Sequence, residues 1–131
     1  MLEVSTFDYA VIRFVPRVER EEFINVGVIL SCPARKFLEA RIELDVHKLK
    51  AFAPIIEPKA VRHYLNAIPR ICAGDEAAGE IGRLPQRARF YWLTAQRSTI
   101  IQCSPVHTGF CADAGETLEH LFDKMVRTLE N

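Results

Sequence analysis

The order of the predicted elements indicates an α+β fold. Three strand-like segments come first, two helical segments follow, two further strand-like segments come next, and a helix ends the chain. Runs of strands separated from runs of helices are typical of a largely antiparallel sheet with helices packed on one face. The sequence therefore predicts about five strands, a three-stranded N-terminal meander plus a later hairpin, in a single domain over residues 1–131.

Three segments near the N-terminus have the composition of strands. Residues 7–15 are rich in aromatic and β-branched side chains, and Pro16 ends the run because proline lacks an N–H. Residues 23–31 form a second strand, in which Gly27 marks either a close neighbour or a bulge. Residues 37–44 alternate apolar and polar side chains, which is typical of a strand with one exposed face. Short connectors predict a meander.

Helices are predicted from caps and apolar periodicity. Asp45 begins a short helix that ends before Pro54, and Pro58 takes the first position of the next helix. Asp113 and Glu116 form a capping-box-like start for the last helix. The apolar side chains of that helix recur at helical spacing: Leu118, Leu121, Phe122, Met125, Val126 and Leu129.

The segment between these helices is predicted to be a hairpin. Residues 89–94 and 98–103 are rich in aromatic and β-branched side chains, and residues 95–97 are short enough to connect two antiparallel strands. In such a strand, Phe90 and Trp92 share one face and Tyr91 lies on the other.

Charge is balanced over the whole chain but not along it. The 131 residues include 17 Lys+Arg and 17 Asp+Glu, with 49% hydrophobic and 26% charged side chains. These globular values exclude a disordered tail, and the zero net charge excludes nucleic-acid or membrane binding through the whole surface. Residues 81–112, however, contain four arginines and no acidic residue. Any electrostatic function is therefore expected to be local.

Neither a membrane segment nor a metal site is predicted. No run of about 18 apolar residues occurs, and the N-terminus lacks the pattern of a signal peptide, so we expect a cytoplasmic protein. Scattered cysteines in that compartment are usually reduced thiols. Cys103, His107 and Cys111 have the regular spacing of zinc ligands, but no second close pair completes the site, so we expect no cofactor.

One candidate ligand site combines cationic and hydroxyl side chains that suit phosphate or carboxylate. It comprises Arg97, Ser98, Thr99, His107 and Thr108, with Arg13 or Arg17 assisting. The alternative is a turn and a loop whose polar side chains hydrogen-bond the backbone.

A second candidate is a basic surface made by Arg83, Arg87 and Arg89 beside the aromatic run 90–92. Arginines between aromatic side chains suit nucleic acid, whereas the basic edge of a core strand equally suits an acidic protein partner. His107 has nucleophile candidates nearby, but no nucleophile elbow is present, so a hydrolase or nuclease is the least favoured function.

Two blocks of sequence resemble a known family. The first runs from Asp8 to Arg13 and continues over residues 16–30, and the second covers residues 92–102 and 104–109. Together they resemble the bacterial family catalogued as domain of unknown function 3037, which departs from this chain in often having proline at the positions of Gln96 and Cys103. The resemblance implies a small stand-alone domain and a protein partner, a HipA-like kinase encoded nearby, but no activity.

We therefore expect a non-enzymatic accessory module that binds a protein partner. The alternative is a small anion-, nucleotide- or nucleic-acid-binding domain that uses the candidate ligand site. A homodimer is a further expectation, because an uncovered sheet edge can pair across a two-fold axis.

Overall fold

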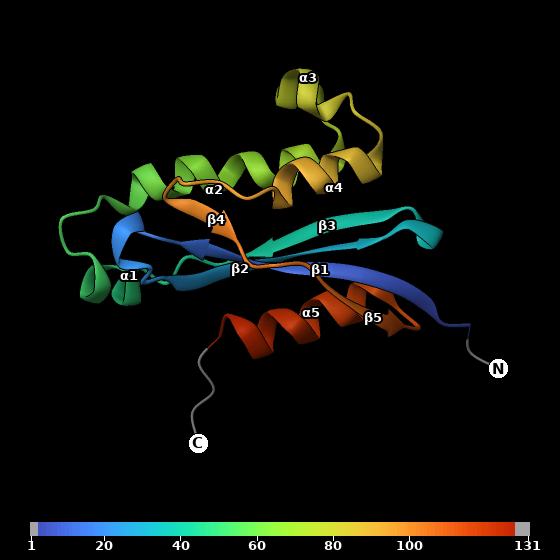
Figure 1. Ribbon diagram of the computed structural model, residues 1–131, viewed down its shortest axis with the longest axis horizontal. Helices are drawn as coiled ribbons and strands as arrows, with labels where there is room; N and C mark the ends of the chain where they lie inside the picture. The colour runs from blue at the N-terminus through green and yellow to red at the C-terminus, as the bar shows by residue number, and fades with distance from the viewer. Residues whose placement is uncertain (1–2, 128–131) are drawn as a thin grey trace.

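The structure, a computed structural model that describes residues 3–127, contains an antiparallel five-stranded sheet in the order β3-β2-β1-β4, with β5 also paired to β1 (Figure 1). This confirms the α+β class, the strand number and the N-terminal meander. The strands are β1 (Ser5–Phe14), β2 (Ile24–Cys32), β3 (Phe37–Ile42), β4 (Ile101–Cys103) and β5 (His107–Cys111).

Gly27 both admits a close neighbour and borders a bulge, as predicted. Ile12 pairs with Gly27 but Arg13 pairs with Asn25, so Val26 is the extra residue on β2. A Cβ atom on Gly27 would lie 2.8 Å from the carbonyl oxygen of Arg41 on β3. Only a residue without a side chain fits between these backbones without displacing one of them.

Two helices begin at the predicted caps. The Asp45 carboxylate accepts hydrogen bonds from the first turn of its helix, and the Asp113 carboxylate accepts one from the Glu116 N–H. Pro69 lies inside a helix that continues beyond it, and Leu129 lies outside the described residues. The helices are α1 (Val46–Phe52), α2 (Pro58–Ala73), α3 (Gly79–Gly82), α4 (Gln86–Thr94) and α5 (Ala114–Met125). Short 3₁₀ turns are η1 (Val18–Arg20), η2 (Pro33–Arg35) and η3 (Glu76–Ala78).

The strand predicted over residues 89–94 is wrong, because this segment belongs to α4. Phe90 and Leu93, three residues apart, are both buried in the main core, which is the spacing of a helix face. Tyr91 and Trp92 are both exposed, so Trp92 does not share the buried side of Phe90. Tertiary burial of the Phe90–Leu93 stripe outweighed the strand preference of the aromatic run.

The prediction of a hairpin made by residues 89–94 and 98–103 is therefore also wrong. Only Ile101–Cys103 of the predicted strand 98–103 is extended, and it pairs with β1 at Ile12–Phe14. The fifth strand is His107–Cys111, which pairs with the beginning of β1, from Ser5 to Tyr9. Thus β4 and β5 lie one after the other along the same strand and form one edge of the sheet.

Helices cover both faces of the sheet, which differs from the one-sided packing that was predicted (Figure 1). The main core lies between the sheet and α1, α2 and α4, and includes Phe14, Ile29 and Phe90. A second core lies between the sheet and α5, and includes Leu30 and Phe122. The reason is that β2 is buried on both faces from Val26 to Cys32. Within residues 3–127 no helix is long and apolar enough to cross a membrane.

Candidate functional site

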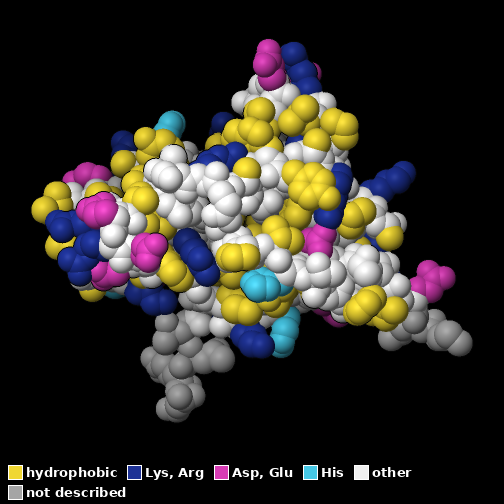
Figure 2. Space-filling view, in the orientation of Figure 1, with side chains coloured by type: hydrophobic (Ala, Val, Ile, Leu, Met, Phe, Trp, Pro, Cys, Tyr) yellow, Lys and Arg dark blue, Asp and Glu magenta, His cyan; other side chains and the backbone are white. Residues whose placement is uncertain are grey.

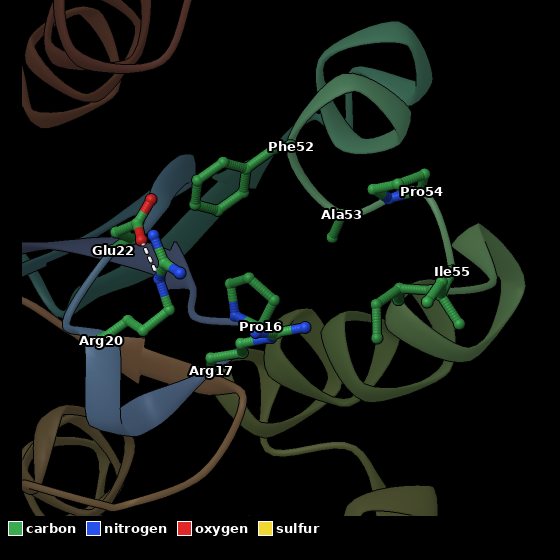
Figure 3. A pocket seen from close by; sticks show the side chains of 9 residues that line it. Pro16, Arg17, Arg20, Glu22, Phe52, Ala53, Pro54 and Ile55 are labelled. Carbon is green, nitrogen blue, oxygen red and sulfur yellow. Dashed lines mark hydrogen bonds and ion pairs between the residues drawn. The ribbon is translucent and has the colours of Figure 1, made fainter.

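A surface pocket of about 480 Å³ lies where the β1–β2 connector approaches the α1–α2 connector (Figure 3). Pro16 ends β1 on one side, and Pro54 prevents α1 from continuing on the other. Its lining is mostly apolar: Pro16, Phe52, Ala53, Pro54, Ile55 and Ile56. The Ile55 side chain is 90% exposed, which is unusual for a large aliphatic residue. The pocket therefore offers an apolar surface that the chain itself does not fill.

Three charged side chains also line the pocket: Arg17, Arg20 and Glu22. The Arg20 guanidinium donates a hydrogen bond to the Glu22 carboxylate, so these two charges neutralise one another. Arg17 is exposed and makes no side-chain hydrogen bond or ion pair within residues 3–127. Figure 3 shows Arg17 beside Pro16, across the opening from Phe52. The pocket thus combines apolar walls with one cation that is free to bind an anionic group.

Of the seven residues predicted to bind a ligand, only Arg17 lines this pocket. Arg97 instead closes the end of α4, where its guanidinium donates to the carbonyl oxygens of Trp92 and Leu93 and lies 4.2 Å above the Trp92 ring. The Thr99 hydroxyl donates to the Ile101 carbonyl at 2.7 Å, and Ser98 is exposed. The Arg97 and Thr99 contacts are those of a helix end and a turn, the alternative that the sequence left open.

Of the remaining predicted ligand residues, Arg13 lies on β1, whereas His107 and Thr108 lie next to each other on β5. His107 is paired with Tyr9, and their rings are 5.4 Å apart. Arg13 is four residues further along β1, about 13 Å away at the usual rise of a strand. Its guanidinium lies 4.0 Å above the Phe23 ring, and its Nε is buried without a hydrogen-bond partner among the described residues. The structure therefore does not bring Arg13 and His107 together.

Folding disperses the predicted basic surface. Arg87 forms an ion pair with Asp8, and Arg89 donates to the carbonyl oxygens of Ile71 and Cys72 at the end of α2. Arg83 follows the short helix α3 and is exposed. Because Arg97 also bonds to carbonyl oxygens, three of the four arginines in residues 81–112 have partners within the chain.

The Asp8–Arg87 pair is the centre of a polar cluster that sequence reasoning missed. The Asp8 carboxylate also accepts a hydrogen bond from the Thr108 hydroxyl at 2.5 Å, and Arg87 also donates to the buried Ser31 hydroxyl at 2.8 Å. These contacts join α4 to β1, β2 and β5. Burial raises the pKa of Asp8, but the hydrogen bonds from Thr108 and Arg87 and the charge of Arg87 lower it, and the net pKa is below the ordinary 3.8. The sequence signal that could have revealed this cluster is Asp8, an acidic residue within an otherwise apolar strand.

One protein-family model matches most of the chain. The family model described as Protein of unknown function (DUF3037) matches residues 9–126, from the first strand to the end of α5. The chain belongs to the DUF3037 family. The resemblance drawn from the sequence is therefore confirmed. Neither the curated proteins nor the solved structures gave a match to the chain.

Three thiols of this DUF3037 chain have pKa values above that of an ordinary cysteine. Burial raises the pKa of Cys103 to about 11 and that of Cys72 to about 12. Burial, together with the neighbouring Cys32, raises the pKa of Cys111. Within the described part of the chain, no three His, Cys, Asp or Glu side chains gather as a metal ion requires. Cys103, which is half-buried on β4, also donates a hydrogen bond to the Leu93 carbonyl.

Proposed function

We propose that the chain is a docking module that binds a protein partner through the pocket between the β1–β2 and α1–α2 connectors. The occupant would be a segment of the partner that carries an apolar side chain next to a carboxylate. The observation that supports this most strongly is the pairing of unfilled apolar walls with the free Arg17 guanidinium. A carboxylate would meet Arg17 while the neighbouring apolar side chain packs against Phe52 and Ile55.

The charge distribution in the pocket supports this choice of ligand. Because Glu22 already neutralises Arg20, the net positive charge at the opening belongs to Arg17. The apolar walls favour an aliphatic or aromatic side chain over a free phosphate, which would gain little from Phe52, Pro54 and Ile55. Both features together favour a protein segment over a small inorganic anion.

The partner to test first is a HipA-like kinase, which the family resemblance implies. Co-expression with the full chain, followed by affinity purification and titration calorimetry, should give a stable complex. Arg17→Glu and Ile55→Asp should each weaken binding by about tenfold or more, because the first repels the carboxylate and the second removes apolar contact. Both side chains are exposed, so the melting temperature should stay unchanged.

The matched control is Lys124→Glu, which changes the net charge as Arg17→Glu does but lies on the exposed side of α5. It should bind the partner like the wild type. Failure of the kinase to co-purify, or equal binding by all three variants, would rule out this pocket as its docking site.

A further inference from the structure

The outer edge of β5 is uncovered and carries no carboxylate, guanidinium or ammonium group. Within residues 3–127, β5 pairs with β1 alone. Its residues are His107, Thr108, Gly109, Phe110 and Cys111. The opposite edge, β3, carries Glu39 and Arg41. Proteins usually protect an uncovered edge with charged residues or proline, because its free N–H and C=O groups pair readily with another strand. The β3 edge has such protection and β5 lacks it.

Exposed apolar side chains accompany this unprotected edge. Phe110 on β5 is 74% exposed, Val106 directly before β5 is 44% exposed, and Val4 directly before β1 is 65% exposed. Tyr91 is 59% exposed, and its ring lies against the guanidinium of Arg87. Arg87 pairs with Asp8, which is the neighbour of Thr108 on β1. Figure 2 shows hydrophobic side chains on this side of the molecule, over α4 and β5. A sheet edge bordered by apolar surface is typical of an interface.

The charges around the edge indicate which partner fits it. Arg87, which approaches β5 through Asp8, is neutralised by the Asp8 carboxylate. The edge therefore offers little to attract a charged peptide of either sign. A second copy of this chain fits better, because a neutral strand opposite itself brings no charged carboxylate or guanidinium against another. We infer that the chain forms a homodimer in which β5 pairs antiparallel with β5 of a second copy.

Gly109, the central residue of β5, sets the register. A two-fold axis at Gly109 places Thr108 opposite Phe110 of the partner subunit, a pair of β-branched and aromatic residues that favours antiparallel strands. Phe110 and its symmetry mate then lie diagonally across the axis. On the other face, the Phe7 ring fills the space that a side chain at Gly109 would need, because its Cζ atom lies 2.8 Å from where a Cβ atom would stand. The two Phe7 rings would approach each other there, and the two sheets would form one of ten strands.

Sedimentation velocity of the full chain over a range of concentrations tests this inference. The wild type should sediment as a dimer at high micromolar concentration. Phe110→Lys should sediment as a monomer with an unchanged circular dichroism spectrum, because the side chain is exposed and lysine protects a free edge. Tyr64→Lys introduces the same charge in place of another exposed aromatic side chain, on α2, and should remain dimeric. A monomeric wild type, or a Phe110→Lys variant that still dimerises, overturns the inference.

A mixing experiment tests the two-fold register itself. Phe110→Asp should also be monomeric, since two carboxylates would face each other diagonally across the axis. An equimolar mixture of Phe110→Lys and Phe110→Asp should regain dimers at low salt, because opposite charges then meet. A mixture that stays monomeric contradicts the pairing about Gly109. The docking pocket plays no part in this experiment, so Phe110→Lys should still bind the partner if the proposed function is right.

Discussion

The two outer strands of the sheet are attached in different ways. β3 follows β2 directly in the chain and pairs with it over six residues, from Gly27–Ile42 to Cys32–Phe37. β4 and β5 return from about 100 residues further along, and pair with β1 over three and five residues. Pairing β3 with β2 closes a short loop, so the backbone hydrogen bonds between the two strands are enough to hold it. Pairing β5 with β1 closes a long loop, which costs more conformational entropy. The structure accordingly adds the Asp8–Thr108 hydrogen bond and the Phe7–Gly109 contact to hold β5.

The largest effect is expected at the β3 side of this comparison, for Gly27→Ala. The new Cβ atom would lie 2.8 Å from the Arg41 carbonyl oxygen and 3.2 Å from Cδ1 of Ile12. Backbone cannot move aside without breaking the β2–β3 ladder, so we expect a loss of about 3 kcal/mol in the free energy of unfolding. Chemical denaturation measures it. A loss below about 1 kcal/mol would show that β3 shifts easily and that its ladder is not the rigid attachment described above.

A smaller loss is expected on the β5 side, for Gly109→Ala. Here the Cβ atom would meet the ring of Phe7, a side chain that can rotate where a backbone cannot. We expect a loss of about 1–2 kcal/mol in the free energy of unfolding. Adding Phe7→Leu, which removes the atoms nearest the new methyl group, should make the two losses less than additive in a double-mutant cycle. Additive losses would mean that the contact does not hold β5 in place.

Local signals in the sequence predicted the meander well and the later segment poorly. Residues 37–44 alternate in polarity, and Asp45 and Asp113 are cap residues before helical patterns, so each element was set by its own residues. The segment 86–94 has strand-forming aromatic residues but folds as α4 because Phe90 and Leu93 become buried against the sheet. That burial depends on residues far away in the sequence, which no local pattern contains.

The candidate site was predicted only in part for the same reason. Arg17 was predicted to assist ligand binding, but Phe52 and Ile55 line the pocket through the meeting of two connectors about 35 residues apart in the sequence. Likewise, the charge excess of residues 81–112 was visible in the sequence, whereas its neutralisation was not. Asp8 reaches Arg87 across 79 residues, and Arg89 reaches the end of α2. Which residues so far apart become partners depends on the order of the strands in the sheet and not on their spacing in the sequence.

A smaller effect than that of either glycine substitution is expected for Asp8→Asn, which weakens the polar attachment of β5. The Asp8 side chain is 17% exposed and that of Arg87 is 34% exposed, so water screens part of their attraction. We expect a loss of about 1 kcal/mol in the free energy of unfolding at neutral pH. The folded-state pKa of Asp8 is lower than the ordinary 3.8, so its contribution is complete well above 3.8 and is lost as the pH falls through the folded-state value.

The β3 edge supplies the matched control for this pH dependence. Glu119→Gln removes the carboxylate that pairs with Arg41 at 3.0 Å, but both side chains are largely exposed, so the loss should stay below about 0.5 kcal/mol. In a denaturation series from about pH 7 downward, the difference between the wild type and Asp8→Asn should stay constant above 3.8 and shrink as the pH falls below it, because protonation removes the charge of Asp8. A difference that persists unchanged to the lowest pH would show that Asp8 holds β5 through neutral hydrogen bonding alone. The two edges would then differ in packing and not in charge.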